Sequence, residues 1–378
     1  MKRLVLAGGG HAHLAVLDAL ARDPLRDVEV TLVTPAAKQA YSGMLPGWIA
    51  GHYARPEIEI DLESLARRAN VTLLRDCIGA MDASRRCVVV SDRRHLQYDV
   101  LSLDVGSEID TSRLETLGDR LLPLRPIAGF LERWPDMLDT ARDHPGFRIA
   151  VVGAGAAGIE VALAVRYAFD RERVNGKVCL VAPREKFLAG HGPGARRRVA
   201  DWMRRARVEL QDGHAVGTRD GLLLPDGSTI PVDGVIAATG AAPPCWLKLS
   251  GLRLDQQGYI AVDSCHRSVS HDHVFAAGDV CSREDPHFAR SGVHAVRAGP
   301  VLAANLAATL TGGRLREYRP RRRSLYLLAC GPRDAIVSWG NLGGGGRWAW
   351  WWKDRIDRGF VGRHSVVPGG MRERPAQL

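Results

Sequence analysis

The chain has 378 residues, of which 46% are hydrophobic and 25% are charged, and its formal net charge is +10. This composition fits a folded protein of two domains and excludes disordered and collagen-like chains. No stretch approaches the roughly 20 uninterrupted apolar residues of a membrane-spanning helix, and the apolar run after Met1 is too short for a secretory signal peptide. The basic charge favours anionic ligands, phosphates or an anionic membrane surface, although charged runs are commonly just solvated faces.

The seven cysteines indicate reduced thiols, because their number is odd and no C-x-x-C spacing occurs. Reduced thiols are typical of the cytosol, so we expect a cytoplasmic protein without a disulfide framework and without a metal site. Nucleic-acid binding is not expected, because no recognisable reading motif accompanies the basic charge.

The first predicted element is a short apolar strand that runs into a glycine turn and a helix, "LVLAGGGHAHLAVL", residues 4–17. Gly8 and Gly10 fill the first two positions of the dinucleotide-binding pattern G-x-G-x-x-G, but His13 stands at the third. A nucleotide site, a metal site at His11 and His13, and a plain tight turn are the alternatives. Residues two apart on a helix point about 200° apart, which excludes a shared metal ion. We expect His13 to push the helix and the strand slightly apart.

The opening pattern recurs at mid-chain in "IAVVGAGAAGIEVAL", where Gly153, Gly155 and Gly158 fill all three glycine positions. In both copies a second apolar strand ending in a small residue and proline follows, and then an aspartate, an apolar strand and a glycine turn. Two such modules predict an α/β fold with two doubly wound Rossmann-like dinucleotide-binding domains and parallel sheets. The phosphates of a dinucleotide bind at the helix N-terminus, where free N–H groups and the helix dipole favour an anion.

The second strand of the second module leaves the choice of nicotinamide cofactor open. Ala182 stands near the place where a ribose-binding carboxylate is usual. Arg184 and Lys186 would suit the 2′-phosphate of NADPH, whereas Glu185 between them would suit NADH, for which there is a slight preference. The proline-bearing segment 123–137 is predicted to be the crossing between the domains.

A return crossing is expected near Pro244, and then "HDHVFAAGDVCS" predicts an apolar strand that runs into Gly278 and Asp279. A helix-like stretch follows and is closed by the glycines at 312 and 313. The segment "SLYLLACGPRDAIVSWGNL" has the pattern of a β-hairpin.

The last predicted element is a helix in "RWAWWWKDRIDRGF", where Trp348, Trp352, Ile356 and Phe360 form one stripe. Tryptophan with basic residues on a short amphipathic helix is typical of a protein that lies on a membrane interface. The alternatives are that the stripe covers the protein's own core or a homodimer interface. We therefore expect a cytoplasmic protein that either stays free or contacts the inner face of the cytoplasmic membrane.

Two dinucleotide modules and a later apolar strand ending in Gly-Asp resemble the two-dinucleotide-binding flavoproteins, the pyridine nucleotide-disulfide oxidoreductase superfamily, over roughly residues 1–313. The resemblance implies FAD in the first module, NADH or NADPH in the second, and contact of Asp279 with the ribityl chain of FAD. It implies an FAD-binding domain of residues 1–120 and 245–318, an NAD(P)-binding domain of residues 121–244, and a small C-terminal hairpin and helix region of residues 319–378.

Within that superfamily, "GGGHAHLAVL", "YSGMLPGWIAGHY" and "HFARSGVHAVRAG" resemble type II NADH dehydrogenases and sulfide:quinone reductases, and more closely the oxidoreductase domain fused ahead of selenide, water dikinase. Segment 41–47 holds no cysteine where thiol-disulfide reductases carry a redox pair, which disfavours dithiol chemistry. Its residues are expected to line the flavin pocket or, alternatively, to be core. The expected FAD contacts are Gly8, Gly10, His11, Tyr41, Gly43, Met44, Pro46, Gly278, Asp279 and Val293.

Two catalytic residues are expected. Glu160, one turn into the second module's helix, either complements the helix dipole or, as the resemblance implies, lies near the contact between nicotinamide and flavin. The helix starting near residues 291–294 would point its positive end at the flavin and favour negative charge there, with His294 as an added donor. The expected NAD(P) contacts are Gly153, Gly155, Gly158, Arg184, Thr239 and Gly240.

The sequence departs from these relatives at the end of the first module, where Asp104 and Val105 replace the Ala-Thr of an Ala-Thr-Gly turn. No glutamine-bearing quinone motif follows Asp279. The predicted function is that of an FAD-dependent NAD(P)H dehydrogenase that passes electrons to a small-molecule acceptor, for which a quinone is the first candidate.

Two other functions are kept open. In the first, a sulfide or selenium compound is oxidised through a thiolate of Cys281 or Cys330, although buried, inert thiols are expected there. In the second, the chain is a nucleotide-binding accessory module without catalysis, because fold alone does not determine function.

Overall fold

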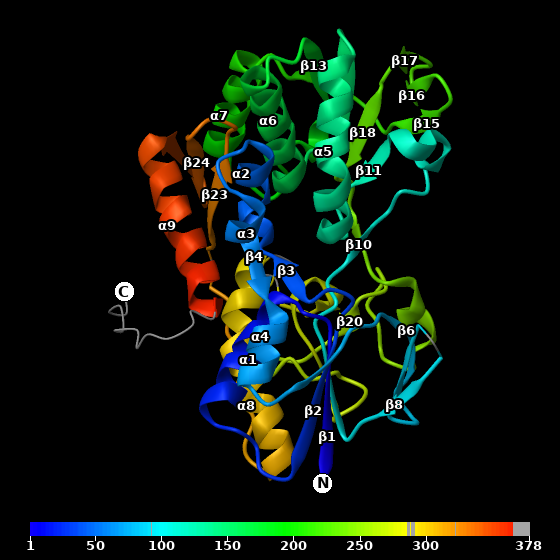
Figure 1. The fold of residues 1–378 in the computed structure, drawn as a ribbon, viewed down its shortest axis with the longest axis vertical. Helices are drawn as coiled ribbons and strands as arrows, with labels where there is room; N and C mark the ends of the chain where they lie inside the picture. Colours follow the sequence, from blue (N-terminus) through cyan, green and yellow to red (C-terminus); the bar gives the residue numbers. More distant parts are fainter. Residues whose placement is uncertain (92, 286–287, 289–291, 322, 366–378) are drawn as a thin grey trace.

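The computed structural model describes residues 1–378 except 92, 286–287, 289–291, 322 and 366–378. Two five-stranded parallel sheets, each covered by helices, form the two halves of the molecule, and a small C-terminal sheet and helix lie along one side (Figure 1). The predicted α/β class and the two Rossmann-like modules are confirmed.

The first sheet has the strand order β21-β9-β1-β2-β5. Its strands are nearly continuous apolar runs, as expected for a parallel sheet covered on both faces. Helices α1 and α8 pack side by side against it (Figure 1). The bounds are β1 (Lys2–Ala7), α1 (His11–Arg22), β2 (Val28–Val33), α4 (Leu62–Arg68), β5 (Thr72–Leu74), β9 (Val100–Leu103), β21 (Val274–Ala276) and α8 (Gly292–Thr311).

The second sheet has the order β11-β18-β12-β13-β14. The prediction that residues 123–137 form the crossing is wrong, because this segment supplies edge strand β11 and helix α5. Phe130, Leu131, Trp134 and Leu138 are buried at helical spacing, a periodicity hidden by the prolines around it. The bounds are β11 (Leu121–Pro123), α5 (Ile127–Asp143), β12 (Phe147–Val152), α6 (Ala156–Arg171), β13 (Gly176–Val181), α7 (Pro193–Arg205), β14 (Glu209–Gln211) and β18 (Gly234–Ala237).

The crossing itself is a two-stranded antiparallel ribbon of β10 (Glu108–Ile109) and β19 (Ala241–Ala242). The outgoing and returning chains therefore lie side by side, and the Thr239 hydroxyl donates to the Asp110 carbonyl at 2.8 Å. The predicted return near Pro244 matches the end of β19.

The C-terminal region contains the predicted hairpin, β23 (Leu325–Ala329) and β24 (Ala335–Trp339), and a third strand, β25 (Leu342–Gly346). The third strand was not predicted, because a run of four glycines is an unusual strand sequence. Helix α9 (Arg347–His364) follows it. This sheet packs on α6 and α7, while α9 extends toward the first half and contacts α3 and β4 (Figure 1).

Smaller elements complete the fold. Antiparallel strands β3 (Lys38–Ala40) and β4 (Glu59–Asp61) enclose η1 (Ser42–Met44), α2 (Leu45–Ile49) and α3 (Arg55–Ile58). The remaining strands are β6 (Ile78–Asp82), β7 (Cys87–Val90), β8 (His95–Gln97), β15 (Val216–Thr218), β16 (Gly221–Leu223), β17 (Thr229–Ile230), β20 (Ile260–Ala261) and β22 (Cys281–Ser282). The remaining 3-10 turns are η2 (Glu115–Arg120), η3 (Arg184–Lys186), η4 (Cys245–Leu249) and η5 (Gly278–Val280).

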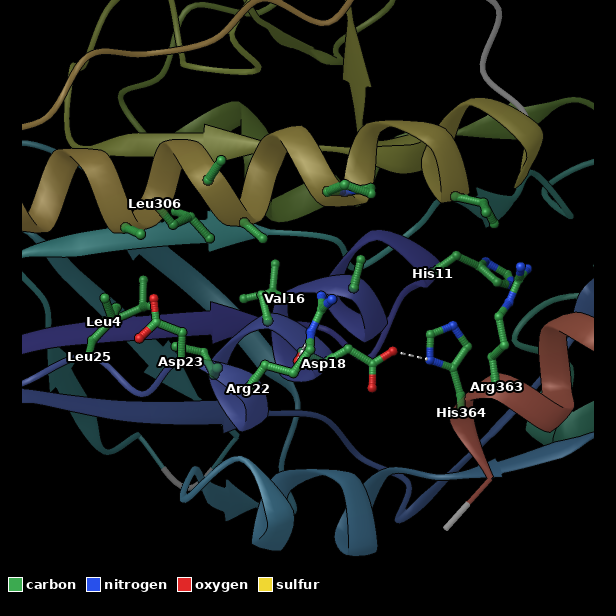
Figure 2. A pocket seen from close by; sticks show the side chains of 18 of the residues that line it. Leu4, His11, Val16, Asp18, Arg22, Asp23, Leu25, Leu306, Arg363 and His364 are labelled. Carbon is green, nitrogen blue, oxygen red and sulfur yellow. Dashed lines mark hydrogen bonds and ion pairs between the residues drawn. The ribbon is translucent and has the colours of Figure 1, made fainter. Parts of the chain in front are cut away.

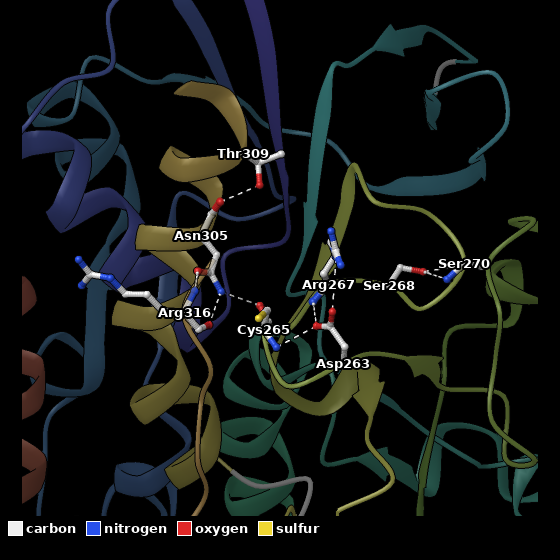
Figure 3. Close-up of polar contacts among 8 residues, drawn as sticks. All are labelled: Asp263, Cys265, Arg267, Ser268, Ser270, Asn305, Thr309 and Arg316. Carbon is white, nitrogen blue, oxygen red and sulfur yellow. Dashed lines mark hydrogen bonds and ion pairs between the residues drawn. The ribbon is translucent and has the colours of Figure 1, made fainter. Parts of the chain in front are cut away.

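Buried Asn305 of α8 fastens two loops to this helix (Figure 3). Its amide nitrogen donates to the carbonyls of Cys265 at 2.9 Å and Arg316 at 2.8 Å, and its oxygen accepts from the Arg316 N–H at 2.7 Å. Asp263 accepts from the N–H groups of Cys265 and Arg267. These bonds hold the loop that leads into β21, and therefore help to position Gly278 and Asp279.

Candidate functional site

The first glycine turn brings the chain against the end of β9. Gly8 has a φ of 96°, and a Cβ at Gly8 or Gly10 would overlap Asp104, so only glycine fits. The carboxylate of Asp104 lies under the turn and accepts from the N–H groups of Ala12 at 2.8 Å and His13 at 3.1 Å. A side chain from β9 therefore binds the N-terminus of α1.

His13 is fully buried and hydrogen-bonded rather than merely wedged between helix and strand. Its Nδ1 lies 2.6 Å from the Gly8 carbonyl and its Nε2 lies 2.8 Å from the Ser102 hydroxyl. Because a carbonyl can only accept, Nδ1 carries the proton and Nε2 accepts from Ser102. Burial lowers the pKa of His13 to about 4, so the ring is neutral at pH 7. The sequence predicted a wider spacing and missed these bonds.

The Asp104 carboxyl group is an acid that titrates near neutrality. Burial raises its pKa to about 7, the two backbone N–H groups oppose this rise, and the charge of Asp279 adds to it. A carboxylate of this kind is expected to exchange its proton when the charge around it changes.

Asp279 lies beyond the first glycine turn and pairs with a residue that was not predicted. Its Oδ2 is 2.8 Å from Nη1 of Arg125, and that nitrogen also donates to Ser107 at 2.5 Å. Arg125 follows β11, so it reaches the first module from the start of the second. No sequence pattern linked it to Asp279.

Two buried polar atoms near this turn lack a hydrogen-bond partner among the described residues, Asp279 Oδ1 and His11 Nε2. Buried polar atoms without a partner are costly, and they mark positions where a ligand or water can bind. The phosphates and ribityl hydroxyls of FAD offer acceptors and donors of the required kinds. The residues at this turn therefore fit FAD.

His11 and Tyr41 form an aromatic cluster with Phe360 of α9. The His11 ring lies 5.4 Å from the Tyr41 ring and 5.8 Å from the Phe360 ring, and burial lowers the pKa of His11 to about 4. In segment 41–47, Met44 and Pro46 are buried, and their contact with the flavin also stays a prediction. Contact of Tyr41 and Gly43 with the flavin stays a prediction.

Glu160 is half-buried and belongs to a charged cluster with two buried residues of α9. Its Oε1 accepts from the Ala329 N–H at 2.8 Å. Burial raises the pKa of Glu160 to about 7, and the nearby charge of Lys353 opposes the rise. Lys353 donates to Asp357 at 2.6 Å and to the Gly43 carbonyl at 2.6 Å. The i,i+4 spacing in "KDRID" was the only sequence signal for this pair.

The second glycine turn has the close packing that the pattern requires. A Cβ at Gly153 would overlap the Ala238 carbonyl, and one at Gly158 would overlap the Gly153 carbonyl, whereas Gly155 and Gly240 face open space. The Thr239 side chain bonds the crossing rather than the turn. Contact of these residues with NAD(P) stays a prediction.

Arg184, expected to contact NAD(P), is largely exposed and pairs with Asp212 at 3.0 Å. Asp212 follows β14 and also accepts from the Arg184 N–H at 3.0 Å. A carboxylate that follows β14 therefore lies beside Arg184, which sequence spacing could not reveal. Contact of Arg184 with NAD(P) stays a prediction.

The start of α8 is described from Gly292 onward, and Ser291 lies outside the described residues. Val293 is half-buried in its first turn. The predicted donor His294 is buried, and its Nδ1 lies 2.9 Å from the Tyr318 hydroxyl. Burial lowers the pKa of His294. Its role toward the flavin stays a prediction.

A cavity of about 510 Å³ opens between α1, α8 and the last turns of α9 (Figure 2). Its walls are mainly aliphatic, and Val16, Val296 and Pro300 are among them. At the α9 end, His364 Nδ1 lies 2.9 Å from the Asp18 carboxylate and His11 completes the wall. Arg22 and Asp23 line the cavity farther from α9 (Figure 2). Apolar cavities of this size with few polar groups are typical binding sites for small molecules.

Neither cysteine proposed for sulfide chemistry offers a reactive thiolate. Cys281 and Cys330 are buried, and burial raises the pKa of Cys330 well above its ordinary value. Reactive cysteines are partly exposed and have a lowered pKa. The structure therefore does not favour sulfide or selenium oxidation.

Comparisons with known proteins agree with this geometry. The family model described as pyridine nucleotide-disulphide oxidoreductase matches residues 2–299. The NADH dehydrogenase-like protein YutJ of Bacillus subtilis is 22% identical over 75% of this chain and 77% of its own. The probable ferredoxin reductase CtmF of Castellaniella defragrans is 25% identical over 75% of this chain and 69% of its own.

Solved structures have the same fold. The sulfide:quinone oxidoreductase of Aquifex aeolicus superposes with a TM-score of 0.78 at 15% identity, over 97% of this chain and 93% of its own. The water-forming NADH oxidase of Lactobacillus brevis superposes with a TM-score of 0.74 at 22% identity, over 90% of this chain and 75% of its own.

Proposed function

The chain belongs to the pyridine nucleotide-disulphide oxidoreductase family, and from that premise we propose that it is an FAD-dependent NAD(P)H dehydrogenase whose acceptor is a quinone. Its cofactors are FAD and a nicotinamide dinucleotide. FAD, when bound, supplies the two-electron redox chemistry, and the protein supplies binding, orientation and electrostatics. Gly8, Gly10, His11 and Asp279 would hold FAD, and the turn of Gly153 and Gly155 would hold the nicotinamide cofactor.

Glu160 is the proton-carrying residue in this proposal. With a pKa of about 7, it can both take and release a proton at neutral pH, which is the property of an efficient general acid or base. Burial raises that pKa, and the charge of Lys353 on α9 limits the rise.

The apolar cavity between α1, α8 and α9 is the observation that carries the choice of acceptor (Figure 2). It adjoins His11, so a flat apolar molecule bound there would lie beside the expected flavin site. Asp18 and His364 at the same end could exchange protons with a reduced acceptor. The relatives are named for different acceptors, so the acceptor of this chain has to be measured.

Anaerobic mixing tests the donor half of the proposal. NADH or NADPH is expected to bleach the flavin absorbance of the purified protein, and re-oxidation by a panel of soluble quinones is expected to restore it. A colourless protein that does not take up FAD would favour the accessory-module alternative, and a coloured protein that neither nucleotide bleaches would overturn the dehydrogenase assignment.

Filling the cavity tests the acceptor half. Ala304→Phe places a ring in the cavity wall, and Thr311→Phe on the exposed end of the same helix is the matched control. We expect Ala304→Phe to raise the quinone KM at least tenfold while the rate of bleaching by NADH is unchanged. Equal quinone kinetics in the two variants would remove the cavity from the reaction.

We also propose that α9 contacts an anionic membrane surface. Three of the four predicted stripe residues, Trp348, Trp352 and Ile356, are at least 42% exposed, and Trp351 lies beside them at 55%. Phe360 faces inward, so the stripe does not cover the core as a unit. Exposed tryptophans with arginines are typical of interfacial helices. Among the described helices, none has the length and apolarity that a bilayer crossing requires.

Vesicle flotation tests this contact. Binding to phosphatidylglycerol-containing vesicles is expected to exceed binding to phosphatidylcholine vesicles and to weaken with salt, because part of the attraction is electrostatic. Trp351→Ser with Trp352→Ser is expected to abolish it. A dimer in sedimentation analysis that these same changes dissociate would instead make this face a homodimer interface.

A further inference from the structure

The two glycine turns can be compared position by position, because both modules have the same strand register. Leu103 pairs with Ala7 in the first sheet, and Ala237 pairs with Val152 in the second, so Asp104 and Ala238 are equivalent. His13 and Gly158 are equivalent as well, each five residues after the first glycine. The second module has Gly158 and Ala238 in contact, where the first has His13 and Asp104.

The replacement of glycine and alanine by His13 and Asp104 places an acid where a dinucleotide site needs positive potential. The N-terminus of a helix favours the pyrophosphate, because its first N–H groups are free. In the first module Asp104 already binds the N–H groups of Ala12 and His13. Its carboxyl group also touches Gly10, the glycine over which a pyrophosphate is expected to pass.

Among the described residues, no cation acts on the pKa of Asp104. Helix α1 presents neutral His13 and, further out, His11, both with lowered pKa values. Turn η5 presents Asp279, whose charge repels Asp104. Arg125, the cation that pairs with Asp279, is also bonded to Ser107. An ionised Asp104 and a bound pyrophosphate would therefore repel each other inside a buried space.

We propose that this chain binds FAD with Asp104 protonated, so that binding takes up one proton from solvent and weakens as the pH rises above neutrality. The inference rests on FAD as the cofactor of the first module. No covalent bond forms or breaks, and the buffer supplies the proton. Without FAD and above neutral pH, Asp104 serves as an internal anion that occupies the helix N-terminus, and with FAD it is a neutral neighbour of the phosphates.

The pH dependence of FAD affinity tests the proposal. The dissociation constant of FAD, measured by flavin fluorescence at equilibrium, is expected to be nearly constant below pH 6. It is then expected to rise about tenfold per pH unit above pH 7, because one proton is linked to binding. Asp104→Asn keeps an oxygen for the N–H groups but cannot ionise, so its dissociation constant is expected to stay flat between pH 6 and pH 9.

A matched variant and a second measurement distinguish Asp104 from the other titratable groups. His11→Asn removes another titratable group at the turn and is expected to keep the wild-type pH slope, even if its affinity is lower. Calorimetry of wild-type apoprotein with FAD at pH 8, in buffers of different ionisation enthalpy, is expected to report uptake of close to one proton. This second readout needs no variant.

The outcomes are separable from those of the proposed function. A flat pH profile in the wild-type protein, or no proton uptake at pH 8, overturns the role of Asp104 while leaving FAD as the cofactor. Absence of FAD binding at every pH overturns the proposed function itself. A pH slope that persists unchanged in Asp104→Asn assigns the proton to another group and also overturns this inference.

Discussion

At the level of single residues, His13 and Asp104 depend on each other, because their side chains together fill the space under the first glycine turn. The His13 ring is hydrogen-bonded to the Gly8 carbonyl and to the Ser102 hydroxyl. Its backbone N–H donates to the Asp104 carboxylate. In the second module a glycine and an alanine occupy the same space. Different residue pairs can thus support one backbone turn, provided that the buried polar groups are all bonded.

A double-mutant cycle measures this coupling. His13→Gly alone is expected to lower the free energy of unfolding by about 2–4 kcal/mol, because it removes a buried ring and leaves its partners unpaired. His13→Gly combined with Asp104→Ala copies the second module and is expected to cost less than the sum of the two single changes, by roughly 1 kcal/mol or more. Urea unfolding is the measurement, and strict additivity would contradict the coupling.

Lys353 is the second residue with a distinct prediction. Lys353→Met leaves Asp357 and Glu160 without their cation, so we expect a loss of about 3–5 kcal/mol in unfolding free energy. The pKa of Glu160 is expected to rise further, and the pH profile of flavin bleaching by NADH is expected to move to higher pH. Lys248→Met, at an exposed lysine, is the control. An unmoved profile in Lys353→Met would show that this charge does not act on Glu160.

At the level of elements, helix α9 has one face packed against the protein and another exposed to solvent. Its inward face carries Trp350, Lys353, Asp357 and Phe360, and its outward face carries Trp348, Trp351 and Trp352. The predicted stripe combined residues of both faces, because four-residue spacing drifts around a helix with 3.6 residues per turn. Apolar spacing alone could not reveal that the buried face contains a lysine and an aspartate.

Two neighbouring tryptophans of α9 provide a matched test of this orientation. Trp350→Ala is expected to lower the unfolding free energy by about 3–5 kcal/mol, because the ring is buried. Trp351→Ala, on the exposed face, is expected to change it by less than about 1 kcal/mol. Urea unfolding of the two variants gives the comparison, and a loss in Trp351→Ala equal to or larger than that in Trp350→Ala would contradict this orientation of α9.

The elements with a strong local signal were predictable, and those defined by distant partners were not. Both glycine turns, the strand before Asp279 and the hairpin after residue 324 follow from periodicity and turn chemistry. Strand β25 was missed because Gly343 and Gly345 fit against the neighbouring backbone, which gives no local strand signal. Helix α5 was missed because its prolines suggested a linker. The contacts of Arg125 with Asp279 and of Lys353 with Gly43 join segments more than 150 residues apart, so no local pattern could contain them.

At the level of the whole molecule, histidines with lowered pKa values limit stability at low pH, and carboxyl groups with raised pKa values limit it at high pH. Burial lowers the pKa values of His11, His13 and His266 to about 4, so the stability they contribute is complete above pH 6.5 and is lost as the pH falls toward 4. Burial raises the pKa values of Asp104 and Glu160 to about 7, so their contribution is complete below about pH 4 and is lost as the pH rises through 7.

The stability of the apoprotein is therefore expected to be greatest between pH 6 and pH 7. Asp104→Asn removes one of the two groups that oppose a rise in pH, so the maximum is expected to move to higher pH. Urea unfolding at half-unit steps from pH 5 to pH 8.5 measures the shift. A maximum that stays in place in this variant would mean that Asp104 does not titrate in this range.

The insertion of one sheet domain inside the other has a consequence for synthesis on the ribosome. Strand β9 obtains its neighbour β1 at once, but its other neighbour, β21, is translated roughly 170 residues later, which takes roughly 10 to 30 s at common elongation rates. During that interval the nascent first domain has an open strand edge and lacks Asp279, whereas the inserted domain can already fold. On the proposed contact of Asp279 with FAD, the cofactor would bind the finished chain and not the unfinished one. This interval is when chaperones that cover strand edges are expected to matter most.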